Sequence, residues 1–147
     1  MKLRDYQRAA IDGIYTFFSE AEGNSLVVVP TGGGKSVIAA KFIQEVSETW
    51  KDERILMVTH VRELISQNHA TLMRCWPDAP AGIYSAGLGR RDTDDRILFA
   101  GVQSIYQRAK QIGHFDIVIV DEAHLIPPKG VGMYQQLLAG LREINPK

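Results

Sequence analysis

Cysteine is almost absent from this sequence, because Cys75 is the only one among its 147 residues. A single cysteine excludes an intrachain disulfide, a C-x-x-C redox pair and a cysteine-based zinc site. His60, His69 and His114 also lack the spacing of metal ligands, so no zinc is expected. A free thiol is usually inert unless nearby cations activate it. We therefore interpret Cys75 as a small buried hydrophobic residue rather than a nucleophile.

Long hydrophobic runs and an excess of one charge are also missing. No apolar stretch reaches the ~18 residues of a membrane span, and residues 1–5 lack the apolar core of a signal peptide. We therefore expect a soluble, cytoplasmic protein that has no membrane partner. Seventeen basic residues balance seventeen acidic ones, so the chain lacks the electrostatic signature of a dedicated nucleic-acid binder. Any contact with nucleic acid must then be local.

A glycine-rich loop at residues 29–36 stands between two apolar segments. Residues 26–29 (Leu-Val-Val-Val) predict a strand, and a helix is predicted from Lys35 to about Trp50. Because glycine lacks a Cβ atom, the loop can bend tightly and turn its N–H groups toward a polyphosphate at the positive end of that helix. The residues expected to surround the phosphates are Thr31, Gly32, Gly33, Gly34, Lys35 and Ser36.

Lys35 and Ser36 carry the chemistry of this loop. Lys35 can reach the β- and γ-phosphates as a mobile point charge, and the Ser36 hydroxyl is placed to ligate Mg²⁺. The Walker A pattern G-x-x-x-x-G-K-[ST] is incomplete here, because Val29 stands where the first glycine belongs. A glycine-rich turn that carries a surface lysine is the alternative interpretation.

Strands and helices alternate along the rest of the chain. Residues 3–21 predict a helix, and residues 85–91 predict a basic loop. Further strands are predicted at residues 54–58, 82–84, 96–100 and 115–120, and further helices from Thr59, at 102–108 and at 133–141. Thr59 is expected to cap its helix. The alternation predicts an α/β fold with a mostly parallel sheet and helices on both faces.

Two carboxylates, Asp121 and Glu122, follow the apolar strand predicted at residues 115–120. Ligands of parallel sheets bind at the carboxyl ends of the strands, so these residues and the glycine-rich loop can face the same nucleotide. Asp121 would then hold Mg²⁺, and Glu122 would orient and deprotonate the water that attacks the γ-phosphate. A solvated acidic turn after a core strand is the alternative.

The loop with Lys35 and the sequence Asp-Glu-Ala-His at residues 121–124 together resemble motifs I and II of superfamily 2 helicases and translocases. Residues 3–7 resemble the Q motif of that superfamily, residues 59–64 its motif Ia, and residues 101–104 its Ib/Ic region. The sequences at residues 121–134 and 85–89 are most similar to those of RadD-like bacterial DNA helicases. The resemblance implies a RecA-like P-loop NTPase domain over residues 1–147, with ATP and Mg²⁺ as cofactors and DNA as partner.

The resemblance also implies roles for residues outside the phosphate loop. Gln7 would read the adenine edge and Arg4 would lie against the base, whereas His124 would couple the nucleotide state to the DNA side. The residues that would meet the sugar-phosphate backbone are Thr59, His60, Arg62, Gly87, Gln103 and Ser104.

Several of these residues have simpler interpretations. Gln7 on an amphipathic helix would ordinarily be solvated, and Arg62 could pair with a neighbouring acidic side chain. Arg90 and Arg91 suit either a solvated loop or phosphate contacts. His124 could be a histidine that only satisfies its hydrogen bonds.

Members of this superfamily continue with a motif III and a second RecA-like domain that carries an arginine finger. We therefore expect these residues to be the first part of a larger DNA helicase with a role in DNA repair. The 147-residue chain should bind nucleotide, hydrolyse it barely and not unwind DNA. A translocase subunit of a restriction or remodelling system, or a nucleotide-regulated binding module, are the alternatives. Without the motif III strand, the sheet is expected to have an empty slot beside residues 115–120.

Overall fold

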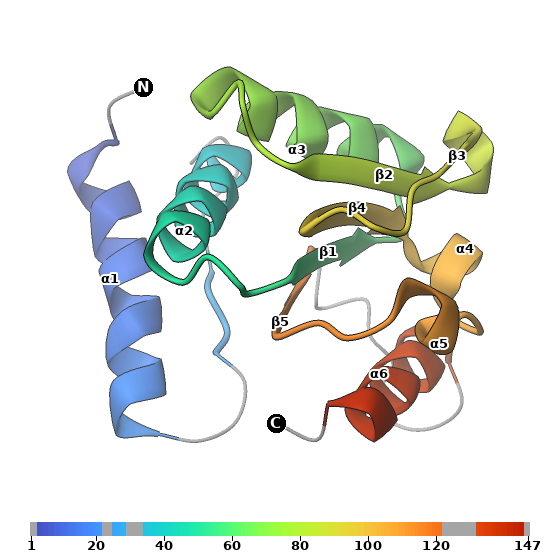
Figure 1. The fold of residues 1–147 in the computed structure, drawn as a ribbon. Helices are drawn as coiled ribbons and strands as arrows, with labels where there is room; N and C mark the ends of the chain where they lie inside the picture. The colour runs from blue at the N-terminus through green and yellow to red at the C-terminus, as the bar shows by residue number, and fades with distance from the viewer. Residues whose placement is uncertain (1–2, 22–24, 29–33, 122–131, 146–147) are drawn as a thin grey trace.

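A computed structural model describes residues 3–21, 25–28, 34–121 and 132–145 of the chain (Figure 1). The helices are α1 (Asp5–Glu20), α2 (Lys35–Thr49), α3 (Arg62–Cys75), α4 (Val102–Ile105), α5 (Ala109–Ile112) and α6 (Met133–Ile144), with a 3-10 turn η1 (Ala86–Leu88). The strands are β1 (Ile55–Thr59), β2 (Ala81–Ser85), β3 (Arg90–Arg91), β4 (Ile97–Gly101) and β5 (Ile117–Val120). Among the described residues, none of the helices combines the length and the hydrophobicity that a membrane-spanning helix needs.

The described strands form one sheet in the order β3-β2-β4-β1-β5. Neighbours are parallel except for β2 and β3, which form a short antiparallel pair. Register aligns the carboxyl ends of the central strands, because Thr59 of β1 pairs with Gly101 of β4 and Val58 pairs with Val120 of β5. These three strand ends therefore lie at one edge of the sheet, where ligands of parallel sheets bind.

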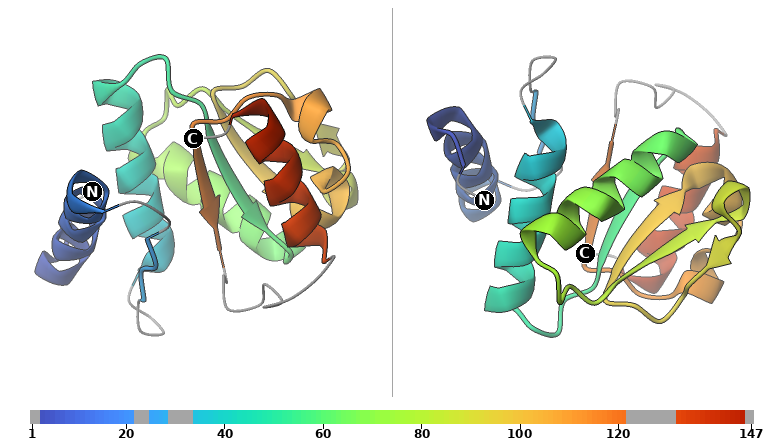
Figure 2. Two further views of the ribbon diagram at one scale, coloured as in Figure 1. Left: turned by 90° about the horizontal axis from the view of Figure 1, so that it is seen from below. Right: turned by 90° about the horizontal axis from the view of Figure 1, so that it is seen from above.

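Alternate side chains of the strands point into two separate hydrophobic cores. Helices α1, α2 and α3 contribute to the core on one face, and α4, α5 and α6 to the core on the other. Figure 2 shows α6 over one face of the sheet in its left view and α3 over the opposite face in its right view. The predicted α/β class, with a mostly parallel sheet between two layers of helices, is confirmed. Cys75 is half-buried against the first core rather than fully buried.

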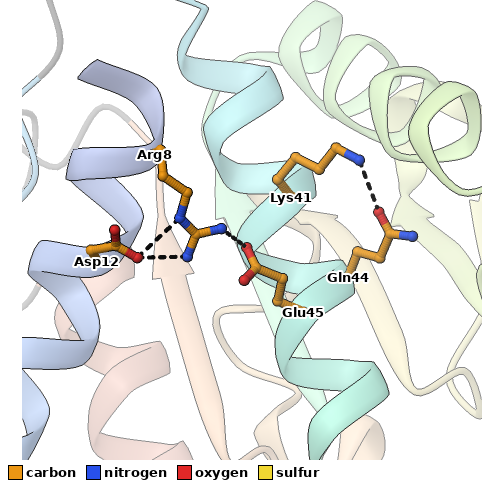
Figure 3. A network of polar contacts seen from close by, with 5 residues as sticks. All are labelled: Arg8, Asp12, Lys41, Gln44 and Glu45. Atoms are coloured by element: carbon orange, nitrogen blue, oxygen red, sulfur yellow. Dashed lines mark hydrogen bonds and ion pairs between the residues drawn. The ribbon is translucent and has the colours of Figure 1, made fainter. Parts of the chain in front are cut away.

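Helix α1 lies at the margin of the first helix layer and packs on α2 (Figure 1). Arg8 links the two helices, because its guanidinium donates to Asp12 on α1 at 2.6 Å and to Glu45 on α2 at 2.8 Å (Figure 3). Hydrogen bonds to Asp12 and then Glu45 raise the pKa of Arg8. All three side chains are at least one-third exposed, so the network orients α1 more than it stabilises the fold.

The strand predicted at residues 26–29 is wrong for residues 26–28, and Val29 lies outside the described residues. Residues 25–28 pair with none of the described strands, and the side chains of Leu26 and Val28 are 74% and 83% exposed. Strand β5 ends the sheet on this side among the described strands, and residues 25–28 do not pair with its outer edge. An apolar run forms a strand only when a partner strand takes its hydrogen bonds.

Two further predictions need correction. Thr59 ends β1 and does not cap a helix, since α3 begins at Arg62 with Val61 in the capping position. The region predicted as a loop at residues 85–91 instead contains η1 and β3, where Arg90 and Arg91 pair with the end of β2. The sequence could not predict β3, because a strand of two exposed residues shows no alternation of buried and exposed side chains.

Candidate nucleotide and nucleic-acid sites

The first group of polar residues surrounds the amino end of α2. This 15-residue helix begins at Lys35, directly after the glycine-rich loop. Asp121 follows β5 at the adjacent strand end, and its backbone N–H donates to the carbonyl of Val58 at 3.0 Å. The fold therefore brings Lys35, at the start of α2, next to Asp121, although 86 positions separate the two residues in the sequence.

Lys35 and Asp121 form an ion pair in which the Nζ–Oδ1 distance is 2.8 Å. The two partners differ in environment, because the Asp121 side chain is 2% exposed while that of Lys35 is 45% exposed. A buried carboxylate needs such partners, since the cost of removing it from water is otherwise several kcal/mol. Lys35 can therefore turn toward a bound anion only if another positive charge takes its place beside Asp121.

Asn68 of α3 completes this group, and sequence reasoning missed it. The Ser36 hydroxyl donates to Asn68 Oδ1 at 2.9 Å, and Asn68 Nδ2 donates to Asp121 Oδ2 at 3.1 Å. One signal could have revealed it: Asn68 lies three residues after Ile65 and four before Leu72, so helical spacing places a polar amide on the buried face. A buried amide requires polar partners.

Gln7 and Gly34 join α1 to the same region. The Gln7 side-chain carbonyl accepts a hydrogen bond from the backbone N–H of Arg4 at 2.8 Å, and Gln7 is only 6% exposed. Gly34 has a φ of +74°, and a Cβ atom there would lie 2.3 Å from Gln7 Nε2. Glycine is therefore needed at position 34 both for its backbone conformation and for the room it leaves Gln7. The solvated interpretation of Gln7 does not hold.

The other residues predicted for this site are Thr31, Gly32, Gly33, Glu122 and His124, which lie outside the described residues. Arg4 is exposed at the start of α1. The described residues fit a magnesium nucleotide in their chemistry. Ser36 uses its hydroxyl proton on Asn68 and so keeps oxygen lone pairs for a cation. Asp121 supplies a carboxylate, and Mg²⁺ in proteins usually takes one or two such ligands together with phosphates and water.

A cavity of about 340 Å³ opens at the neighbouring strand ends, where α3 and α4 begin. It is lined by His60, Arg62, Ile65, Tyr84, Ser85, Ala86, Gly87, Arg91, Gly101, Gln103, Ser104 and Arg108. Five of the six residues predicted to contact nucleic acid lie in this wall. The sixth, Thr59, is buried and accepts a hydrogen bond from the backbone N–H of Val61, so its hydroxyl serves the local turn.

Two hydrogen bonds hold the cavity walls together. Gln103 of α4 donates from Nε2 to the backbone carbonyl of His60 at 2.8 Å, and the backbone N–H of Ala86 donates to the Ser104 hydroxyl at 3.0 Å. Gln103 and Ser104 thus brace the segments around them, in addition to any contact with a ligand. Tyr84 contributes a different feature, because its buried hydroxyl has no hydrogen-bond partner in the described part of the chain.

The cavity wall carries concentrated positive charge. Arg62, Arg91 and Arg108 line it, and no carboxylate does so in the part of the chain that the structure describes. Arg62 lies 3.8 Å from Glu63, which is a loose contact between two exposed side chains. Within the described residues, neither Arg91 nor Arg108 forms an ion pair. In a chain whose formal net charge is zero, this cluster makes the cavity locally positive, which favours an anion there. The sequence predicted this role for Arg62 and left it open for Arg91, whereas Arg108 was not considered.

Comparison with known proteins agrees with this architecture. A sequence model of the ResIII family, described as "Type III restriction enzyme, res subunit", matches residues 1–145. The chain is 32% identical over 129 residues to the putative ATP-dependent helicase IRC3 of Saccharomyces cerevisiae, covering 83% of this chain and 19% of that protein. It is 30% identical over 140 residues to the DNA 3'-5' translocase XPB2 of Sulfurisphaera tokodaii, covering 95% of this chain and 29% of that protein.

The crystal structure of the UvsW helicase from bacteriophage T4 has the same fold, with a TM-score of 0.76 at 20% sequence identity. The alignment covers 96% of this chain and 49% of the UvsW chain. The chain thus spans less than a third of the two curated relatives and about half of this structural neighbour. Its family is nevertheless clear, because the family match includes nearly every residue. The chain belongs to the ResIII family of superfamily 2 helicases and translocases, and its fold is that of their amino-terminal RecA-like domain.

Proposed function

We propose that this chain is the motor domain of a DNA helicase or translocase that couples Mg-ATP hydrolysis to movement along DNA. The observation that carries the proposal is the group at the start of α2, where the Lys35–Asp121 ion pair of 2.8 Å and the Ser36 hydroxyl meet beside a strand end. The basic cavity lies at the same edge of the sheet. One domain thus offers an anion-binding lysine with metal ligands and a separate site suited to a phosphate backbone.

The proposed roles follow from the chemistry of each side chain. Lys35 binds the terminal phosphates, and Ser36 and Asp121 hold the magnesium ion, which would neutralise phosphate charge during transfer. Glu122, outside the described residues, is proposed to orient and deprotonate the attacking water. Gln7, fixed against Gly34, is proposed to read the adenine edge. No covalent nucleophile is needed, because phosphoryl transfer depends on positioning and charge stabilisation.

Within the family we propose a DEAH-type, RadD-like bacterial DNA helicase with a role in DNA repair. The sequence Asp-Glu-Ala-His at residues 121–124 supports the first part, and the sequences at residues 121–134 and 85–89 support the second. A cytoplasmic location stays a prediction. We further propose that the 147-residue chain hydrolyses ATP slowly by itself, since an arginine finger can contribute 10³ to 10⁵ in rate and is expected on a second RecA-like domain. A nucleotide-regulated binding module is the second candidate, and full function of a Glu122→Gln variant would favour it.

The nucleotide site is tested by calorimetric titration of the chain with Mg-ATP and Mg-GTP. The expected result is binding of ATP in preference to GTP, with loss of binding in Lys35→Ala. Lys41→Ala is the matched control, because Lys41 lies six residues after Lys35 on the same helix and donates to Gln44 at 3.5 Å (Figure 3). Equal binding of ATP by Lys35→Ala and the unaltered chain would refute the proposed phosphate site.

The DNA site is tested by fluorescence anisotropy of a labelled single-stranded oligonucleotide over a range of salt concentrations. Replacing Arg91 or Arg108 with alanine should weaken binding of any sequence and reduce the slope of log affinity against log salt by about 0.7 per lost phosphate contact. Arg142→Ala on α6 removes the same charge from an exposed position outside the cavity wall and should leave the slope unchanged. Oligonucleotides of DNA and RNA in parallel decide which nucleic acid is preferred.

A further inference from the structure

Helix α3 has one end in the cavity wall and a buried residue in the nucleotide site. Arg62, its first residue, and Ile65, one turn later, line the cavity. Asn68 follows one turn after Ile65 on the same face and contacts Ser36 and Asp121. At about 1.5 Å of rise per residue, six residues place Arg62 and Asn68 about 9 Å apart along one rigid helix. The two sites therefore share a single structural element.

The orientation of the Asn68 amide is determined by its neighbours. An ionised carboxylate only accepts hydrogen bonds, so the Asn68 NH₂ group must face Asp121, and its carbonyl oxygen must face Ser36. The Ser36 hydroxyl then has to donate its proton to Asn68, which leaves the lone pairs of that oxygen free. One buried amide thus sets the direction of the Ser36 hydroxyl and holds one oxygen of Asp121.

The cavity end of α3 is packed tightly against two backbone segments. A Cβ atom on Gly101 would lie 3.1 Å from Ile65 Cδ1, and one on Gly87 would lie 2.9 Å from Arg62 Cδ. Both glycines belong to the cavity wall. These contacts join the start of α3 to η1 and to the end of β4, so a shift of α3 changes its contacts with both segments of the cavity wall.

We propose that Asn68 is a positioning residue that presents Ser36 and Asp121 to the magnesium ion of a bound nucleotide and links that site, through α3, to the basic cavity. This role rests on the proposed function, for which Asn68 would be the positioning residue and α3 the connection between the two sites. By thermodynamic linkage, a nucleotide that changes the position of α3 changes the affinity of the cavity for a phosphate backbone, and the backbone changes the affinity for nucleotide by the same factor.

The test is Asn68→Leu, which keeps a side chain of similar size and removes both hydrogen bonds. A non-hydrolysable ATP analogue is titrated into the chain with Mg²⁺ and with EDTA, and a labelled single-stranded oligonucleotide is titrated with and without the Mg-analogue. We expect about a tenfold loss of affinity for the analogue in Mg²⁺ and less than a twofold loss in EDTA. In the unaltered chain, the Mg-analogue should change the affinity for the oligonucleotide at least threefold. In Asn68→Leu, the same addition should change that affinity less than twofold.

Gln67→Leu is the matched control, because it makes the same amide-to-alkyl change at the adjacent, exposed position of α3 and should leave all four affinities unchanged. If Asn68→Leu lacks a cooperative melting transition, Asn68→Ala replaces it in the same titrations. Equal losses of analogue affinity in Mg²⁺ and in EDTA would show a merely structural role and overturn the inference, as would an unchanged effect of the Mg-analogue on the affinity for the oligonucleotide. Failure of the unaltered chain to bind the Mg-analogue would instead refute the proposed function, and the inference with it.

Discussion

Replacing Gly34 with alanine should destabilise the fold by about 2–3 kcal/mol. Two terms add. The φ of +74° at position 34 is a left-handed conformation that costs a residue with a Cβ atom about 1–2 kcal/mol. The new Cβ atom would also lie 2.3 Å from Gln7 Nε2, so the buried amide must shift, and we expect the hydrogen bond that its oxygen accepts from the Arg4 N–H to be lost, at about 1 kcal/mol. For a domain of this length the melting temperature should fall by about 5–10 °C.

Two other glycines separate these terms in thermal and urea unfolding measurements. Gly89 has a φ of +68°, and a Cβ atom added there would meet nothing within 4 Å, so Gly89→Ala should lose only the conformational term of about 1–2 kcal/mol. A Cβ atom on Gly13, inside α1, would also meet nothing within 4 Å, and Gly13→Ala should stabilise the fold by about 0.5–1 kcal/mol. Equal losses for the Gly34 and Gly89 variants would refute the contact between Gln7 and the start of α2.

Two more predictions concern a helix contact and a titrating carboxylate. A Cβ atom on Gly140 of α6 would lie 2.8 Å from the Cβ of Ala109. Gly140→Ala should therefore lower the free energy of unfolding by about 1 kcal/mol in urea unfolding, although alanine favours helices. Adding Ala109→Gly to this variant should restore the free energy of unfolding. The backbone N–H of Ile83, and then Arg90, hold the pKa of Asp92 below its ordinary 3.8. The stabilisation from ionised Asp92 is present above its ordinary pKa and is lost as the pH falls through the lower, folded-state pKa. Asp92→Asn should therefore destabilise the protein near neutral pH. In denaturant unfolding, the difference in free energy of unfolding between the variant and the unaltered chain should shrink below about pH 4.

The central strands could be predicted because their signals are local and unambiguous. The apolar runs that became β1 and β4 are buried at every position between two helix layers, and such strands read as continuous hydrophobic segments. That Lys35 and Ser36 lie close to Asp121 was also expected, because both follow apolar runs and ligands of parallel sheets bind where the strands end. The reason holds for Asp121, which follows β5, but not for Lys35, because residues 25–28 before its loop form no strand.

The composition of each site could be predicted only in part, because contacts across the fold have no local signal. Arg91 lies in a loop-like sequence, and only its pairing with Tyr84 in the β3–β2 hairpin brings it into the cavity wall. Arg108 follows a short helix and has no pattern of its own. Asn68 is an intermediate case, since helical spacing marks it as buried but does not reveal that Ser36 and Asp121 are its partners.

Residues 25–28 have a sequence that predicts a buried strand, but the structure places them outside the sheet. Their Leu-Val-Val pattern has the same character as the sequence of β1, so hydrophobicity alone predicts equal burial. The structure assigns opposite environments, because Val28 is 83% exposed and Val58 of β1 is 0% exposed. Val58→Ala should therefore cost about 2 kcal/mol of stability in urea unfolding, and Val28→Ala should change it by less than about 0.5 kcal/mol.

The two valine variants are matched controls for each other, because each removes the same two methyl groups. A loss of about 2 kcal/mol at both positions would mean that residues 25–28 are buried against a strand in solution, and the sheet would then extend beyond β5. A loss at Val58 alone would show that hydrophobic character is not sufficient to place a segment in this sheet. The two outcomes differ at the outer edge of β5, which is unpaired among the described strands, since a strand joins a sheet only at an edge whose N–H and carbonyl groups are unpaired.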